Sequence, residues 1–168
     1  ILAYCLMPNH WHLVLYPKND GDLSAFMRWV TLTHTQRYHA KTKTIGYGHI
    51  YQGRYHSIPV ETDAYFRTLV RYVERNAKRA ALVRRAEDWK WSSLYARTKG
   101  NDAQKKLLST WPVEELDNYL AWVNQAESED ELGRIRSAIA RGRPYGSEAW
   151  VARSVKKFGL QSTVRDPW

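Results

Sequence analysis

The first sixteen residues constrain the fold of this chain most strongly. Two β-rich runs, ILAYCLM at 1–7 and HWHLVLY at 10–16, flank the pair Pro8-Asn9. Apolar and aromatic runs joined by two turn-forming residues predict an antiparallel hairpin. Because the first run already begins at Ile1 with no Met before it, we expect the sequence to start inside a domain.

Beyond the hairpin, the hydrophobic pattern changes to helical periodicity. The segment 49–60 still predicts a strand, interrupted by Gly53. We therefore predict an α+β unit over 1–100 and a helical, basic extension over 101–168. The apolar spacing and the capping residues Asp22 and Thr62 or Asp63 predict helices over 23–40, 62–79, 113–125, 128–141 and 147–158.

The charge balance favours a polyanionic partner. Lys and Arg number 26 and Asp and Glu 17, so 26 − 17 gives +9, with a pI near 9.7. Nucleic acid is the commonest partner of such a chain, although the charge also fits ordinary solubility. The 8 Trp and 11 Tyr fit base stacking on single strands, or simply a packed core.

The cysteine count and the hydropathy indicate the cellular compartment. The single Cys5 excludes an internal disulfide framework and fits a reducing cytoplasm. No apolar run approaches bilayer length and no signal peptide is visible, so we expect no membrane partner.

Two histidines on the second run suggest a metal site. Side chains alternate faces along a strand, so His10 and His12 point the same way while Trp11 and Leu13 point to the other face. Two imidazoles at this spacing can reach one metal ion. The pair can also be two ordinary surface histidines, because the spacing alone is weak.

The helix predicted over 62–79 carries a second chemical signal. Tyr72 and Asn76 lie four residues apart and so share one helix face. A phenol can act as a covalent nucleophile, and an amide oxygen is an acceptable ligand for Mg²⁺ or Mn²⁺. Alternatively, Tyr72 is a half-buried helix residue and Asn76 part of the helix end. Tyr65, two turns earlier on the same face, remains open as the nucleophile.

Together, these residues would form a phosphoryl-transfer site. A metal held by His10, His12 and Asn76 would polarise a DNA phosphate while the phenol of Tyr72 attacks it. Such a site requires a basic surface, and the net charge provides one.

The same residues carry a family resemblance over most of the chain. The matching segments are LMPNHWHLVL at 6–15, IYQGRYHSIPVETDAY at 50–65, RYVERNAKRAALV at 71–83, WKWSS at 89–93 and GRPYGSEAWV at 142–151. The whole pattern resembles the REP-associated tyrosine transposases, which are HUH single-tyrosine enzymes related to the transposases of small single-strand insertion sequences.

The resemblance implies a ferredoxin-like antiparallel sheet with packed helices, and an endonuclease and strand transferase for DNA transposition and recombination. It implies that His10 and His12 are the metal pair, that Tyr72 rather than Tyr65 is the nucleophile, and that Asn76 is a third polar ligand. The enzyme would cleave and rejoin single-stranded or hairpin DNA resembling REP elements through a 5′-phosphotyrosine. Family members act as monomers or homodimers.

Two features depart from the family pattern. Members usually carry an additional strand and helix before the segment at which this sequence begins, so we expect an N-terminally incomplete catalytic domain. Members also often have Asn-Pro after the tyrosine, where this chain has Asn76-Ala77. Because Ala keeps its N–H, we expect a slightly longer helix.

Basic residues near the tyrosine and in the extension are the predicted DNA contacts, with solvated helix faces as the alternative. They are Arg54, Arg71, Arg75, Lys78, Arg79, Arg141 and Arg143. Two other functions stay open: an inactive, sequence-specific DNA-binding remnant, and a metal-dependent phosphodiesterase that uses water and tolerates Tyr72→Phe.

Overall fold

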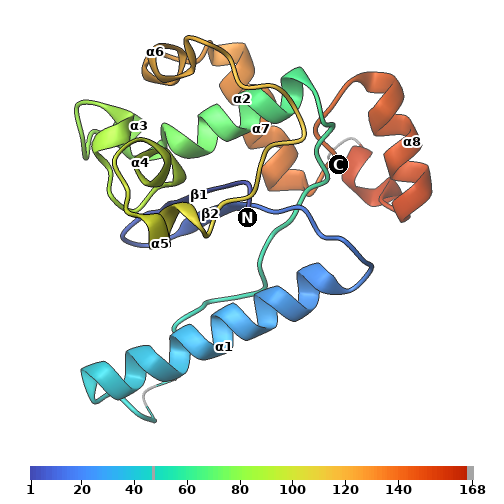
Figure 1. Cartoon of the computed structure of the whole chain (residues 1–168). Coiled ribbons are helices and arrows are strands. Elements are labelled where there is room, and N and C mark those ends of the chain that lie inside the picture. The colour runs from blue at the N-terminus through green and yellow to red at the C-terminus, as the bar shows by residue number, and fades with distance from the viewer. Residues whose placement is uncertain (47, 166–168) are drawn as a thin grey trace. The chain divides into compact units, whose positions relative to one another are not determined.

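A computed structural model describes residues 1–46 and 48–165 of the chain. The chain forms two compact units, coloured by residue number in Figure 1. The first unit joins Ile1–Leu15 to the chain from Ser57 onward, and the second is Tyr16–His56.

The predicted hairpin is confirmed in the first unit. β1 (Ala3–Leu6) pairs with β2 (Trp11–Val14) in antiparallel orientation. The Met7 N–H donates to the His10 carbonyl at 2.8 Å, which closes the tight turn that the Pro-Asn pair predicted.

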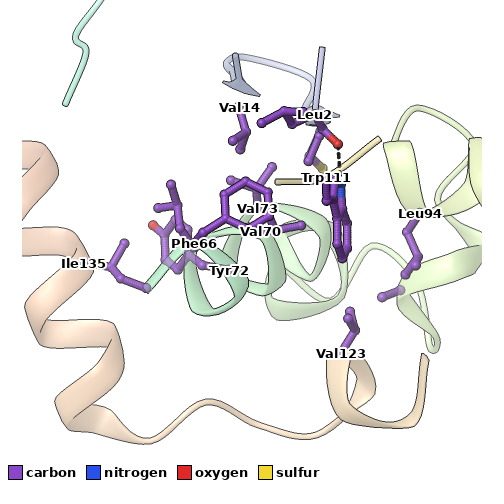
Figure 2. Packing of buried hydrophobic residues seen from close by; sticks show 14 of the residues in the cluster. Leu2, Val14, Phe66, Val70, Tyr72, Val73, Leu94, Trp111, Val123 and Ile135 are labelled. Atoms are coloured by element: carbon purple, nitrogen blue, oxygen red, sulfur yellow. Dashed lines mark hydrogen bonds between the residues drawn. The ribbon is translucent and has the colours of Figure 1, made fainter. Parts of the chain in front are cut away.

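The outer edge of β1 is covered by tryptophans from later in the chain. The Leu6 N–H donates to the Trp91 carbonyl at 2.9 Å, and the Trp89 indole N–H donates to the Leu6 carbonyl at 2.9 Å. At the other end of the strand, the Trp111 indole N–H donates to the Leu2 carbonyl at 2.9 Å, the dashed line in Figure 2. These bonds satisfy strand groups that would otherwise remain open at an edge.

The helix predicted over 62–79 forms as two consecutive pieces. α2 (Ala64–Glu74) begins at Asp63, whose side chain accepts the Tyr65 N–H at 2.8 Å, so Asp63 is the N-cap. At Arg75 the backbone ψ of −3° interrupts the helix, and α3 (Asn76–Arg79) follows. Helix continues past the Asn76-Ala77 pair, as the absence of proline predicted.

A single core surrounds α2, which contacts both strands of the hairpin as well as α6 and α7 (Figure 1). The apolar stripe of α2 supplies Phe66, Val70 and Val73, all buried. Figure 2 shows these side chains together with Leu2 and Val14 from the hairpin and residues from the C-terminal helices. The C-terminal contributors include Trp111, Tyr119, Val123, Leu132, Ile135, Ala138 and Tyr145.

The rest of the first unit is helical. Two of the three helices predicted in the C-terminal extension form nearly as expected, and the one predicted over 113–125 forms only in its second half. The elements are 3₁₀ turns at Ala86–Asp88 and Gln161–Val164, and α4 (Ser93–Thr98), α5 (Asp102–Lys105), α6 (Tyr119–Asn124), α7 (Glu129–Arg141) and α8 (Glu148–Phe158).

The strand predicted over 49–60 was wrong. Only an isolated parallel bridge forms there, between Val60 and Tyr145, and the Tyr145 N–H donates to the Pro59 carbonyl at 2.9 Å. Pro59 has no N–H to offer a ladder and Gly53 adds no packing side chain, so the segment has little to stabilise a regular strand. The segment instead leads into α2 as irregular chain.

The α+β class is confirmed, with an antiparallel sheet, packed helices and a helical C-terminal extension. Within the described residues the sheet consists of β1 and β2. The predicted division at residue 100, between a catalytic domain and a C-terminal extension, concerns function and stays a prediction. By contacts, the extension shares one compact unit with α2.

The second unit is one long helix and its return segment. α1 (Asp22–Thr42) confirms the helix predicted over 23–40. Its N-cap is Gly21 in a left-handed conformation, one residue before the predicted Asp22. The return segment is held to α1 by the Tyr51 hydroxyl, 2.8 Å from His34 Nδ1, and by Tyr55. None of the described helices is long and apolar enough to cross a membrane.

A buried carboxyl in α2 makes stability depend on pH. The Glu74 side chain is completely buried, and its oxygens accept from the Ser93 hydroxyl at 2.5 Å and the Tyr119 hydroxyl at 2.6 Å. Burial raises the pKa of Glu74 above its ordinary 4.5, and outweighs the two hydrogen bonds and Arg97, which lower it. Relative to the unfolded chain, folding therefore favours the neutral acid.

Glu74→Gln should stabilise the protein at alkaline pH. Because the folded-state pKa is raised, the contribution of Glu74 is fully present below about pH 4.5 and is lost as the pH rises through the folded pKa. Gln stays neutral, so we expect the variant to gain about 1–2 kcal/mol at pH 8 and little at pH 4.5. Urea unfolding between about pH 4.5 and pH 8 measures the difference in the free energy of unfolding between the variant and the wild type. A difference that becomes smaller toward alkaline pH would contradict the prediction.

Candidate functional site

The two predicted metal-binding histidines lie side by side near the turn of the hairpin. His12 is on β2 and His10 follows the turn, and their ring centroids are 5.1 Å apart in an edge-to-face arrangement. The hairpin alternation predicted this shared face.

His10 is oriented by an asparagine on each side. Its Nδ1 lies 2.8 Å from the Asn9 side-chain oxygen, and its Nε2 lies 3.3 Å from the Asn76 side-chain nitrogen. An oxygen acceptor at Nδ1 assigns the proton to that nitrogen, which leaves a lone pair on Nε2. This tautomer is the one that can bind a metal through Nε2.

The surroundings of His12 hold it as a neutral imidazole. Burial is the largest cause that lowers its pKa, to about 4, and the neighbouring charges of His10 and Arg79 lower it further. A histidine must be neutral to act as a metal ligand. His12 therefore offers a nitrogen lone pair near neutral pH.

Tyr72 lies next to this pair. It is on α2 and is 8% exposed, and its ring centroid is 5.9 Å from that of His12 in a T-shaped contact. The guanidinium carbon of Arg79 lies 4.0 Å from the centre of the same ring. The predicted nucleophile is thus enclosed by one imidazole and one cation.

Asn76 is the first residue of α3, and its side chain extends toward His10. Its side-chain nitrogen faces His10, and its oxygen accepts from Arg79 Nη2 at 2.8 Å. An amide oxygen has two lone pairs, so this bond leaves one available. Within the described residues, no three His, Cys, Asp or Glu side chains gather to hold a metal. Two neutral imidazoles with an amide oxygen nearby fit Mg²⁺ or Mn²⁺ when further oxygens come from phosphate and water.

Tyr65, the alternative nucleophile, is engaged elsewhere. Its hydroxyl accepts from Arg134 at 3.2 Å, and its ring packs edge-on against Tyr145 at 5.2 Å. The structure brings Tyr72, and not Tyr65, to the histidines.

Four of the predicted DNA contacts bond within the protein. Arg71, 4% exposed, donates to the carbonyls of Gln125 and Ala126 at 3.1 and 2.9 Å. Lys78 donates to the Asn124 carbonyl at 2.7 Å. Arg75 and Arg79 both pair with Glu127, at 2.5 and 2.8 Å. These cations hold the helix to residues 124–127, and the three remaining predicted contacts, Arg54, Arg141 and Arg143, are exposed or partly exposed.

Sequence reasoning missed Glu127. It lies in the acidic stretch AESEDE, which has the composition of a solvated loop, yet its side chain is fully buried. Only the Ser128–Glu131 capping box, which starts α7, marks this position in the sequence, and it gives no sign of burial.

Comparison with known families bears on the same residues. A family model described as "Transposase IS200 like" matches residues 1–76. Residues 1–76, a little under half of the chain, are thus similar to the IS200-like transposases. The matched segment contains His10, His12, Tyr72 and Asn76, and it ends before Glu127. No curated protein and no solved structure matches the chain.

The similarity of residues 1–76 to the IS200-like transposases suggests a coarse function. The matched description is that of a transposase, so the similarity points to a DNA-processing role in transposition. Residues 77–168 lie outside the match, although α6 and α7 pack against the helix that carries Tyr72.

Proposed function

We propose that this chain is an IS200-like transposase of the HUH type, a strand transferase of the REP-associated group. It cleaves and rejoins single-stranded or hairpin DNA resembling REP elements, with Tyr72 as the nucleophile and Mg²⁺ or Mn²⁺ bound by His10, His12 and Asn76. The observation that carries the proposal is that these four side chains lie close together. The ring centroids of His12 and Tyr72 are 5.9 Å apart, and the Asn76 side-chain nitrogen is 3.3 Å from His10 Nε2. The proposal includes a cytoplasmic location and a monomer or homodimer.

Cleavage and rejoining each require one displacement at the DNA phosphorus. The Tyr72 hydroxyl loses its proton as its oxygen forms a bond to phosphorus, and the bond from phosphorus to the 3′-oxygen breaks. The 3′-oxygen takes a proton and leaves as a hydroxyl, while the fragment on the 3′ side of the cut stays joined to the tyrosine through its 5′-phosphate. A bound divalent ion supplies charge stabilisation at the phosphate. Rejoining reverses these steps when a 3′-hydroxyl attacks the phosphotyrosine.

A denaturing gel tests the proposal. Full-length protein is mixed with single-stranded hairpin DNA labelled at either end, with Mn²⁺ or with a chelator. A 5′-phosphotyrosine retains the 3′ part of the strand, so only the 3′-label should migrate with protein. The 5′-label should appear on a short free fragment. The adduct should require the metal and vanish in His10→Ala.

Two outcomes would replace the proposal with another function. Metal-dependent cleavage without a protein-linked label would identify a phosphodiesterase that uses water. Tight hairpin binding without any cleavage would identify an inactive, sequence-specific DNA-binding remnant. One observation favours the inactive remnant: Asn76 Oδ1, the proposed third metal ligand, already accepts a hydrogen bond from Arg79.

The proposed phosphate contacts are Arg54, Arg141 and Arg143, because the four helix cations are bonded within the protein. Arg141→Ala with Arg143→Ala should weaken binding to all hairpin sequences alike. The slope of log affinity against log salt should fall by about 1–2, since each phosphate contact contributes about 0.7–0.9. Fluorescence anisotropy at several salt concentrations measures this slope. Lys90→Ala, an exposed cation in another segment, controls for the loss of charge. An unchanged slope would remove these arginines from the interface.

A further inference from the structure

The Arg79 side chain contacts the Tyr72 ring and the Asn76 side-chain amide at once. It is the last residue of α3, and its guanidinium lies 4.0 Å from the centre of the Tyr72 ring. Nη2 donates to Asn76 Oδ1 at 2.8 Å, and Nη1 donates to Glu127 at 2.8 Å. Both Nη atoms also lie within 3.3 Å of the Tyr72 carbonyl oxygen. One side chain thus joins the predicted nucleophile to the predicted third ligand.

Glu127 holds this guanidinium from the other side. Its fully buried carboxylate accepts from Arg79 through Oε1 and from Arg75 through Oε2. The backbone on either side of Glu127 is fixed, because Ser128 begins α7 through a capping box and Asn124 accepts from Lys78. A carboxylate with so little freedom restrains the arginine that it binds.

The contact with Arg79 also determines which amide atom faces His10. A guanidinium only donates hydrogen bonds, so it selects the oxygen of the Asn76 side chain and leaves the nitrogen toward His10 Nε2. His10 Nε2 accepts in this tautomer and selects the same orientation at a longer distance, 3.3 Å against 2.8 Å for Arg79, so without Arg79 the amide would be held by that one weaker contact.

We propose that Arg79, restrained by Glu127, is the positioning residue for Tyr72 and Asn76. The inference rests on the proposed function for its catalytic consequence, and on the structure alone for its geometry. It places a necessary part of the site, Glu127, outside the segment that the transposase family model matches. It also gives Arg79 a role inside the protein in place of the phosphate contact that its charge suggested.

Three variants separate positioning from general stability. Arg79→Lys keeps the charge beside Glu127 but loses the planar fork that reaches Asn76 at the same time. Glu127→Gln keeps the shape of the side chain and removes its charge. The matched control is Glu87→Gln, because Glu87 is also buried and bonds to Asn124, three residues before Glu127.

The first measurement is the single-turnover rate of adduct formation at saturating DNA, with DNA affinity and Tm beside it. We expect Arg79→Lys and Glu127→Gln to slow the first-order rate by about tenfold or more while DNA affinity changes less than about threefold. Glu87→Gln should stay within about threefold of the wild type in both quantities. Equal rate losses in all three variants, following Tm, would reduce Arg79 to a structural residue and overturn the inference.

The second measurement needs no activity and no metal. In nitrogen-15 spectra, the Asn76 side-chain amide should have its own dispersed resonance pair, and Arg79→Lys should move that pair to the position of free carboxamides while Glu87→Gln leaves it in place. If the wild type forms no adduct, the proposed function fails and this spectrum still decides the positioning. An Asn76 resonance unchanged by Arg79→Lys would overturn the inference even if the adduct forms.

Discussion

Tyr72→Phe is expected to abolish the covalent protein–DNA adduct, with a fall of at least about 10³-fold. The substitution removes one oxygen and leaves a ring of the same shape between His12 and Arg79. Because the apolar contacts of the ring in the core remain, Tm should change little. DNA affinity should also remain, since in the proposed mechanism the hydroxyl acts in the chemical step and does not hold the DNA backbone.

Tyr65→Phe is the matched control for this loss. Tyr65 lies on the same helix, and its hydroxyl accepts from Arg134 and not from any group at the histidines. The variant should lose that hydrogen bond and keep the adduct. The adduct is measured by denaturing gel with a 3′-labelled strand. An adduct that survives in Tyr72→Phe, or disappears in Tyr65→Phe, would move the nucleophile away from Tyr72.

The parts of the fold that local sequence patterns encode were predictable. Alternation and a two-residue turn placed the hairpin, and with it the shared face of His10 and His12. Helical spacing put Tyr72 and Asn76 on one face of the helix. Family resemblance then chose between Tyr72 and Tyr65, which spacing alone left open.

The partners of the helix cations were not predictable from such patterns. Arg71, Arg75 and Arg79 have the spacing of a solvated basic face, but their acceptors lie about fifty residues later in the chain, in residues 125–127. Burial of a long cation depends on that distant carboxylate and not on local periodicity. The strand expected over 49–60 failed for a related reason, because a strand requires a neighbour to pair with. Only Tyr145 provides one there, as a single bridge.

A chain that ends at residue 118 is expected not to fold its first unit. The shortened chain would lose Val123 and Ile135, which are 0% exposed, and Tyr119, which is 4% exposed. Burying an aliphatic side chain of this size contributes about 1.5–3 kcal/mol, and a domain has only about 5–15 kcal/mol of net stability. The truncation would also leave Arg75 and Arg79 without Glu127 and remove one of the hydroxyls that Glu74 accepts from. Several losses of this size together exceed the stability available.

Circular dichroism and urea unfolding of the two chains test this expectation. The truncated chain should lack a cooperative transition and form no adduct. A chain that ends at Leu160 is the control, because Gln161–Val164 contains no buried residue, and it should unfold as the full chain does. Cooperative unfolding of residues 1–118 with an intact Tyr72 adduct would show that the helices beyond residue 118 are an appendage. Loss of both would make them part of the catalytic unit, since the segment between α6 and α7 binds Arg71 of the helix that carries Tyr72, and Arg75 and Arg79 that follow it.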